Sequence, residues 1–275
     1  MPHCLIRKLE HFTRLSGEDK RALQGLAQKV RHIGPHQDII REGDTPLYVN
    51  LILEGWACRY KQLEDGRRQI ISFFVPGDLC DPHVFVLRQM DHSIGSLTPL
   101  RLAQIPREAL LAVTDQHPRI TRALWWEALV TAATQREWTV NIGQRSALER
   151  MAHLFCELFI RLRCVGLSEA DSCPMPVTQA ELADAMGLTS VHVNRTLKEM
   201  RSAGLIVLKS KTLTIPDLAA LQKVALFNAN YLHLEHEGAH LDANEPDHVV
   251  GGSAPVTSGA AWRHNGAGSR AEHGR

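Results

Sequence analysis

One stretch of the chain decides the fold: VTQAELADAMGLTSVHVNRTLKEM, residues 177–200. Thr178 and Glu181 have the spacing of a capping box and predict the start of a first helix. Gly187 stands where that helix must stop and where the chain must turn with a positive φ. A second helix follows, capped by Thr189 or Ser190. Two short helices joined in this way are typical of a helix-turn-helix, whose second helix enters the major groove of DNA.

The predicted second helix turns its apolar residues inward and leaves its polar and small residues outside. Arg195, near its middle, can make a bidentate contact to guanine, and Val191 can touch a thymine methyl group. The predicted base-reading residues are Ser190, Val191, Asn194 and Arg195. The predicted contacts to the DNA backbone come from Thr178, Gln179, Thr189, His192, Lys198, Lys209 and Lys211.

The charge distribution supports this interpretation. Residues 204–215 predict a β-hairpin wing after the second helix. Between residues 189 and 215 there are five Lys or Arg side chains and one acid, a local charge of +4. The 275-residue chain carries a formal charge of only +1, so the average conceals a basic patch. With 44% hydrophobic and 22% charged residues, the composition excludes wholesale disorder, a collagen-like fibre and a disulfide scaffold.

In the region before the helix-turn-helix, the sequence pattern changes from helical to β-rich and then back to helical. A capping box at Ser16 and Asp19 predicts an early helix. Residues 30–105 then form short β-rich runs separated by turn signals, with Asp65-Gly66 as a strong hairpin signal. Many short strands at regular spacing predict a sandwich, a barrel or a roll.

A long helical segment follows. Residues 118–145 predict one helix, and the capping box Ser146-Ala147-Leu148-Glu149 predicts a restart at Ala147. The first helix would pair with a second copy of the chain through Ile120, Leu124, Leu129 and Trp138. The alternative is that this helix packs only on its own domain. The segment 235–275 is poor in large apolar side chains and is predicted to be a disordered tail.

The six cysteines contain no CxxC pair, so they predict reduced thiols and no zinc site. The first ten residues lack the apolar region of a secretory signal, and no run of about 18 apolar residues could span a membrane. These features predict a cytoplasmic protein with no membrane partner and no bound metal.

The chain resembles the CRP/FNR family of bacterial transcription regulators from about residue 5 to about residue 232. Leu53-Glu54-Gly55 and Pro76-Gly77-Asp78 match turns of the family's sensor, residues 146–152 its hinge, and residues 179–197 its DNA-reading unit. The resemblance implies an α+β fold: an N-terminal cyclic-nucleotide-binding-like β-roll (a double-stranded β-helix or jelly roll), a long dimerisation helix and a C-terminal winged helix-turn-helix. The implied domains are a sensor at 1–117, the dimerisation helix at 118–145, the DNA-binding domain at 146–234 and the tail at 235–275.

By the same resemblance, the protein is a homodimer on a palindromic double-stranded DNA operator, with RNA polymerase as a further partner. A signal in the β-roll would reorient the DNA-binding domains about the hinge at Ser146. Ser190 and Val191 stand where the nucleotide-responsive members carry Arg and Glu, so the operator should differ at the corresponding base pairs.

The effector position departs from the family pattern. Cyclic-AMP-binding members have Gly-Glu-x-x followed by Arg-Ser, whereas this chain has Cys80-Asp81-Pro82-His83 and His92-Ser93. Loss of the cationic fork argues against cyclic AMP. Only Cys4 lies where the oxygen-sensing branch carries several cluster-binding cysteines, so no iron–sulfur cofactor is expected. The candidates for another ligand are His83, Arg88, His92 and Ser93.

Two functions from other classes stay open at this point. One is a small-molecule-binding module whose helical hairpin serves protein contacts, which would show no salt-dependent DNA binding. The other is an enzyme with a His/Cys/Asp site around Cys80, Asp81, His83 and His92. The sequence has no nucleophile elbow, P-loop or GxGxxG, so the expected protein is not an enzyme.

Overall fold

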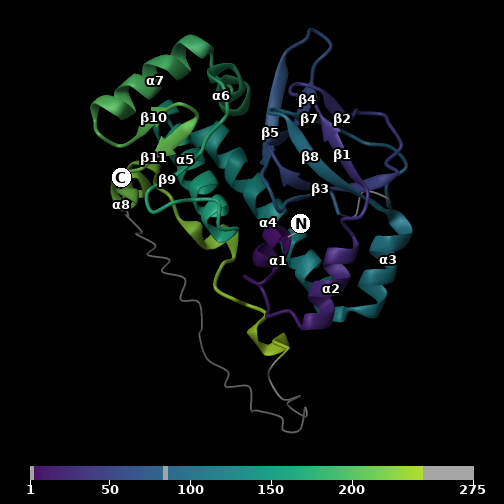
Figure 1. The fold of residues 1–275 in the computed structure, drawn as a ribbon. Coiled ribbons are helices and arrows are strands. Elements are labelled where there is room, and N and C mark those ends of the chain that lie inside the picture. The colour runs from purple at the N-terminus through teal and green to yellow at the C-terminus, as the bar shows by residue number, and fades with distance from the viewer. Residues whose placement is uncertain (1–2, 83–85, 244–275) are drawn as a thin grey trace, which may run out of the picture. The chain divides into compact units, whose positions relative to one another are not determined.

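The computed structural model describes residues 3–82 and 86–243 (Figure 1). Two four-stranded antiparallel sheets form the β-rich region. The first contains, in order across it, β1 (Val30–Ile33), β8 (Leu100–Pro106), β3 (Tyr48–Glu54) and β6 (Leu79–Cys80). The second contains β2 (Asp38–Ile40), β7 (Ser93–Ser96), β4 (Ala57–Gln62) and β5 (Arg68–Phe74). The predicted roll of short strands is confirmed, and the Asp65-Gly66 turn joins β4 to β5.

Helices flank this roll and connect it to the C-terminal part. They are α1 (His3–Leu9), α2 (Gly17–Gly25), α3 (Arg107–Gln116), α4 (Pro118–Gln144) and α5 (Ala147–Cys164). The capping boxes at Ser16 and Ser146 both form, and each hydroxyl accepts from the backbone three residues on. The predicted break between α4 and α5 is therefore confirmed. Helices α1 and α3 were not predicted, because their short apolar patterns adjoin loops and strands.

The C-terminal part is a small winged domain. Its elements are β9 (Ser172–Pro174), α6 (Gln179–Met186), α7 (Ser190–Ser202), β10 (Val207–Lys209), β11 (Thr212–Thr214), α8 (Leu218–Ala225) and the 3₁₀ turn η2 (Ala229–Leu232). A further 3₁₀ turn, η3 (Ala239–Leu241), follows the domain. The wing hairpin β10–β11 gains β9 as a third strand, in the order β10-β11-β9. That strand lies between α5 and α6 in the sequence.

The long helix α4 is shared between two hydrophobic cores, and this corrects part of the predicted pairing face. Ile120 and Leu124 are buried in the core of the β-roll. Trp138 is buried in the core that joins the roll to the winged domain. Of the four predicted pairing residues only Leu129 is exposed. The apolar pattern of α4 identified buried positions correctly but could not show that the chain itself buries them.

Residues 235–243, the described start of the predicted tail, pack against the N-terminal region instead of being disordered. The Asp242 carboxylate accepts from the backbone N–H of Arg14 at 2.6 Å and from the Thr13 hydroxyl at 3.2 Å. Gly238 lies so close to Phe12 that a Cβ would be 2.7 Å from its ring. Polar and backbone contacts hold this segment, which explains why counting apolar residues missed it. The rest of the predicted tail, 244–275, lies outside the described residues.

A buried histidine makes the stability of this fold dependent on pH. His153 on α5 packs against the rings of Phe227 and Tyr231, with centroids 4.8 and 5.8 Å away. Burial, and then the charge of Arg145, lowers its pKa from 6.5 to about 3. The ring therefore stays neutral in the folded protein at pH 5, whereas the unfolded chain takes up the proton.

Stability is therefore expected to fall as the pH drops below about 6.5, with this residue contributing about 2 kcal/mol of loss between pH 7 and pH 5. Urea unfolding of the wild type and of His153→Phe at both pH values measures this contribution. The variant should show the smaller pH dependence. An identical pH dependence in the two proteins would contradict the assignment.

Candidate nucleic-acid interface

The helix-turn-helix forms as its sequence predicts. The Thr178 backbone N–H donates to Glu181 Oε2 at 2.7 Å, and the Glu181 N–H donates to Thr178 Oγ1 at 3.2 Å, which completes the capping box of α6. Gly187 ends α6 with φ 62° and ψ 40°, the left-handed conformation expected of the turn. Thr189, and not Ser190, caps α7 by accepting from the His192 N–H at 3.2 Å.

Helix α7 buries one face and exposes the other. Val193, Leu197 and Met200 lie in the core. On the opposite face Ser190, Val191, Arg195 and Lys198 are exposed, and His192 and Asn194 are half-buried. Val191 is 81% exposed, so its methyl groups are accessible on this face. This face combines a cation with small and apolar groups, which is the chemistry that base edges in a major groove require.

One predicted DNA-contacting residue has a partner within the protein. Asn194 on α7 donates from Nδ2 to Gln179 Oε1, near the start of α6, at 3.1 Å. This bond joins the two helices across their outer surface. It uses one of the two N–H donors of the Asn194 amide and leaves the second N–H and Oδ1 for a base.

The wing places two lysines at its tip. Strands β10 and β11 are joined by a two-residue turn in which Ser210 and Lys211 both have positive φ, at 50° and 62°. This is the conformation of the tight turns that favour hairpins. Lys209 and Lys211 are both exposed, as are Thr178, Gln179 and Thr189 on the helical side. The predicted backbone-contacting residues are thus accessible, with His192 partly so.

The first helix of the motif contacts the β-roll (Figure 1). Arg68 Nε on β5 donates to Asp184 Oδ2 on α6 at 2.8 Å, and Gln69 Nε2 donates to the Ala185 carbonyl at 3.1 Å. The same strand contributes Phe73 to the core that contains α5. The winged domain and the sensor are therefore joined by packing and by an ion pair, not by the hinge alone.

The predicted effector position contains an ionic cluster built around an arginine that the sequence did not single out. Arg59 on β4 is buried and pairs with Asp81, and its Nε lies 3.2 Å from His92 Nε2. The other His92 nitrogen lies 2.6 Å from Asp91 Oδ1. Burial alone would raise the pKa of Asp81, but the hydrogen bond to His92 and the charge of Arg59 hold it below its ordinary value.

The other predicted effector residues are dispersed. Ser93 accepts from the Glu42 N–H at 3.0 Å, and Arg88 is exposed. His83 lies outside the described residues. Of the three predicted effector residues that the structure describes, only His92 therefore belongs to the cluster. Arg59 could have been suspected from the strand pattern, since its side chain shares the inward face of β4 with Ala57, but its carboxylate partner comes from a distant turn.

Most of the cysteines lie in the protein interior. Four of the cysteines are buried, and burial raises the pKa of Cys58, Cys156 and Cys173 to about 12. Within 3–82 and 86–243 no group of three or more His, Cys, Asp or Glu side chains could hold a metal ion. No described helix is long and apolar enough to cross a membrane.

Comparisons with known proteins agree with this geometry. Residues 30–117 match the cyclic nucleotide-binding domain, and residues 149–224 match the Crp-like helix-turn-helix domain. The nitrogen fixation regulation protein FixK of Bradyrhizobium diazoefficiens is 28% identical over 224 residues, covering 81% of this chain and 92% of FixK. The transcriptional activatory protein AadR of Rhodopseudomonas palustris is 30% identical over 207 residues, covering 75% of this chain and 84% of AadR.

The fold is also that of a solved relative. The structure of FixK2 from Bradyrhizobium japonicum matches with a TM-score of 0.65 at 21% identity, covering 73% of this chain and 98% of that one. A β-roll, a long connecting helix and a winged helix-turn-helix thus occur together, and both domain matches fall on the elements that form them. The chain belongs to the CRP/FNR family of DNA-binding transcription regulators.

Proposed function

We propose that the protein is a homodimer that reads a palindromic DNA site with the exposed face of α7. The observation that carries the proposal is this face itself, where Arg195 and Val191 project next to a lysine-tipped wing. In a two-fold dimer, two such helices enter successive major grooves about 34 Å apart. Ser190, Val191 and Arg195 contact base edges, and Asn194 helps to set the position of α7 through Gln179.

The residues around this face supply the contacts to phosphate. Lys198, Lys209 and Lys211 are exposed cations, and each phosphate that they neutralise releases counterions. Thr178, Gln179, Thr189 and His192 lie near the helix ends, where hydroxyl, amide and ring groups meet the DNA backbone. These contacts position the protein without reading sequence.

The dimer forms through a seam on α4 that its own chain leaves uncovered. Trp125, Leu129 and Ala132 are exposed along one side of the helix, four and three residues apart, and Val140 is exposed further along the helix. Spacings of this kind place side chains on the seam of a two-helix coiled coil. Trp125 is 59% and Leu129 66% exposed, a large apolar area for the surface of a single helix.

Arg195→Ala is expected to weaken binding to the preferred operator by about 1–3 kcal/mol and to relax the preference at one base pair, because the bidentate contact to guanine is lost. Fluorescence anisotropy with the operator and with single-base variants of it measures both effects. The operator itself can be obtained by selecting bound sequences from a random pool.

Lys211→Ala is the matched control, since it removes a cation of the wing and no base contact. It should weaken binding to all sequences equally. The slope of log K against log salt concentration should become shallower by about 1, because one phosphate contact is lost. An Arg195→Ala protein with unchanged affinity and preference would overturn the assignment. Binding that does not depend on salt would favour the protein-contact alternative.

The residues at the effector position do not fit a cyclic phosphate. The buried guanidinium of Arg59 already pairs with the partly buried carboxylate of Asp81. An anionic ligand there would have to compete with that carboxylate for the guanidinium. We therefore propose a regulator that does not respond to cyclic AMP, and adding that nucleotide to the anisotropy assay should leave operator affinity unchanged.

The remaining roles follow from this proposal. The protein acts by binding and not by catalysis, in the cytoplasm, and it passes its effect to RNA polymerase at the promoter. Transcription reconstituted from purified polymerase and an operator-bearing promoter tests the last step. The expected result is a change in transcript that disappears with Arg195→Ala.

A further inference from the structure

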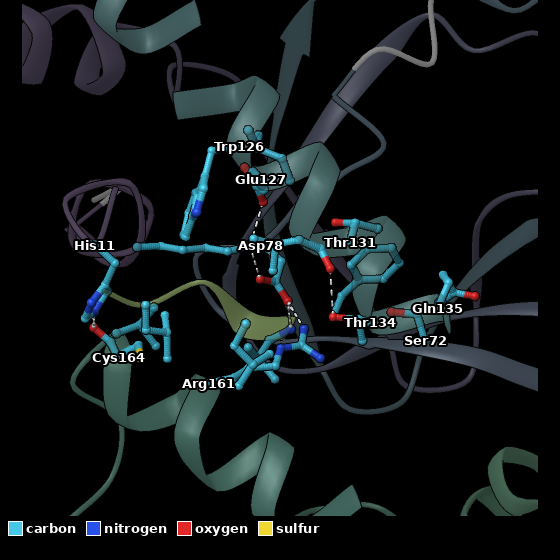
Figure 2. A pocket seen from close by; sticks show the side chains of 18 residues that line it. His11, Ser72, Asp78, Trp126, Glu127, Thr131, Thr134, Gln135, Arg161 and Cys164 are labelled. Carbon is cyan, nitrogen blue, oxygen red and sulfur yellow. Dashed lines mark hydrogen bonds and ion pairs between the residues drawn. The ribbon is translucent and has the colours of Figure 1, made fainter. Parts of the chain in front are cut away.

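A network of largely buried ion pairs makes the β-roll, α1, α4 and α5 one frame. Arg161 on α5 donates from Nη2 to Asp78 Oδ2, in the turn before β6, at 2.8 Å. Lys8 Nζ on α1 donates to Asp78 Oδ1 at 2.7 Å and to Glu127 Oε1 on α4 at 2.6 Å. Figure 2 shows Asp78 between Glu127 and Arg161. These bonds do not reach α6 and α7, so the position of the helix-turn-helix depends on other contacts.

The C-terminal end of α6 is one place where this frame meets the helix-turn-helix. Strand β5 bonds to two residues near this end through Arg68 and Gln69, as described above. Arg150, near the start of α5, donates from Nη1 to the carbonyl of Met186, the last residue of α6. Only residues 187–189 separate that carbonyl from the first residue of α7. A displacement of the Met186 carbonyl is therefore transmitted to α7 over a very short connection.

The same guanidinium bonds to the C-terminal end of α4. Arg150 Nη2 donates to the Ile142 and Arg145 carbonyls, at 3.1 Å each. The capping box of α5 leaves the first of these carbonyls without its helical donor. The Ser146 N–H, which would continue α4 by donating to it, donates to Glu149 Oε2 at 2.7 Å. Arg150 replaces that donor, and one side chain thus connects the last turn of α4, the start of α5 and the end of α6.

The chemistry of this junction suits an arginine. Helix C-termini carry partial negative charge, and a cation there is stabilising. A guanidinium offers several N–H donors in a fixed plane, whereas an ammonium is a single point charge. Burial lowers the pKa of Arg150, and among the described residues its buried Nε has no hydrogen-bond partner. Holding this charge in the junction therefore costs free energy, which the three bonds to carbonyl oxygens offset.

We propose that Arg150 is a positioning residue that sets the direction of α7 relative to α4. It does so through the Met186 carbonyl and the turn at Gly187, without touching a base. Since the proposed dimer pairs through α4, Arg150 then fixes the distance and the angle between the two α7 helices. The effect on DNA rests on the proposed function, whereas the junction of α4, α5 and α6 does not.

The requirement for a particular half-site spacing measures this role. One base pair inserted between the half-sites moves the second one by about 3.4 Å along the DNA axis and by about 35° around it. A rigidly oriented pair of helices loses contacts on such DNA, while a loosely oriented pair adapts. In anisotropy with the full chain, the wild type should prefer the selected spacing at least about tenfold over spacings one base pair longer or shorter.

Arg150→Met removes the guanidinium and keeps an unbranched apolar side chain. It should bind the selected operator about tenfold more weakly, and its preference between spacings should fall to about threefold or less. Arg150→Lys keeps the cation but not the planar set of donors, so its preference should lie between the two. Arg31→Met, which removes an exposed charge from β1, is the matched control and should behave as the wild type. An equally sharp spacing preference in Arg150→Met would overturn the proposal.

Affinity for DNA with a single half-site separates positioning from direct contact. One α7 helix binds such DNA alone, so its orientation relative to the second copy no longer matters. Arg150→Met and the wild type should bind it within about twofold of each other. A loss there as large as on the full operator would mean that Arg150 contacts phosphate or only maintains the local fold, and would overturn the proposal. Circular dichroism verifies that each variant is folded.

Hydrogen exchange tests the junction in the free protein, without DNA. Backbone amides of residues 183–188 should exchange at least about threefold faster in Arg150→Met, because the end of α6 loses one anchor, while those of β3 should be unaffected. Unchanged exchange at the end of α6 would overturn the proposal whatever the DNA results. A wild type that selects no operator would instead contradict the proposed function, and the exchange experiment would still decide on the junction.

Discussion

Leu129→Glu is expected to convert the dimer to a monomer. The side chain is 66% exposed on α4, and in a symmetric pair it meets the same seam of the second copy. The substitution places two carboxylates where apolar side chains would be buried, and the like charges repel at short range. The monomer can engage only one half-site, so operator affinity should fall at least about a hundredfold, because the second recognition helix is no longer tethered.

Sedimentation velocity measures the first effect and operator anisotropy the second. Leu47→Glu is the matched control, because Leu47 is 68% exposed in the loop before β3 and lies outside the seam. It should stay dimeric and bind the operator normally. A Leu129→Glu protein that remains dimeric at micromolar concentration would refute the seam on α4.

Local signals were the most predictable part of this fold. The capping boxes at Ser16, Ser146 and Thr178 each formed with both of their bonds, because all partners lie within three residues. The turn at Gly187 is equally local, since a single left-handed residue ends α6. With these points fixed, the α7 face that carries Arg195 follows from the helical period alone.

Features that depend on distant partners were not predictable in the same way. Arg59 meets Asp81 only when β4 and the turn after β6 are folded together. Asp242 is held by Thr13 and Arg14, more than two hundred residues earlier in the chain. No periodicity within either segment reveals such a contact, and a polar segment that is tied down by hydrogen bonds has the same composition as a free one.

Helix α4 combines a local signal, its apolar pattern, with contacts to distant parts of the chain. The helix has large apolar residues on several sides, so its sequence predicts burial without specifying against what. Ile120 and Trp138 are buried by the protomer, whereas Trp125 and Leu129 remain exposed. Only the packing of the roll and of α5 on α4 separates the two groups. A substitution at Trp138 therefore tests the fold, and one at Leu129 tests assembly.

Trp138→Ala is expected to destabilise the protomer by about 3–5 kcal/mol through the lost burial and the cavity that remains. Trp138 is buried, lies edge-on to the ring of Phe73 with centroids 5.8 Å apart, and donates from Nε1 to Glu157 Oε2 at 3.0 Å. Glu157 keeps Tyr231 and Arg161 as donors, but it loses one bond in a fully buried position. The midpoint of thermal unfolding should fall by about 6–20 °C.

The comparison is best made in the Leu129→Glu background, where the contribution of dimerisation is absent. In that background Trp125→Ala is the matched control: the same side chain is removed from the same helix, but from a site that is 59% exposed. Its midpoint should change by about 2 °C or less, since substitutions at exposed sites usually change stability by less than about 0.5 kcal/mol. Equal effects of the two tryptophan substitutions would mean that Trp138 is not held between the β-roll and α5. In that case the bond from Trp138 to Glu157 would not be what holds α5 against α4.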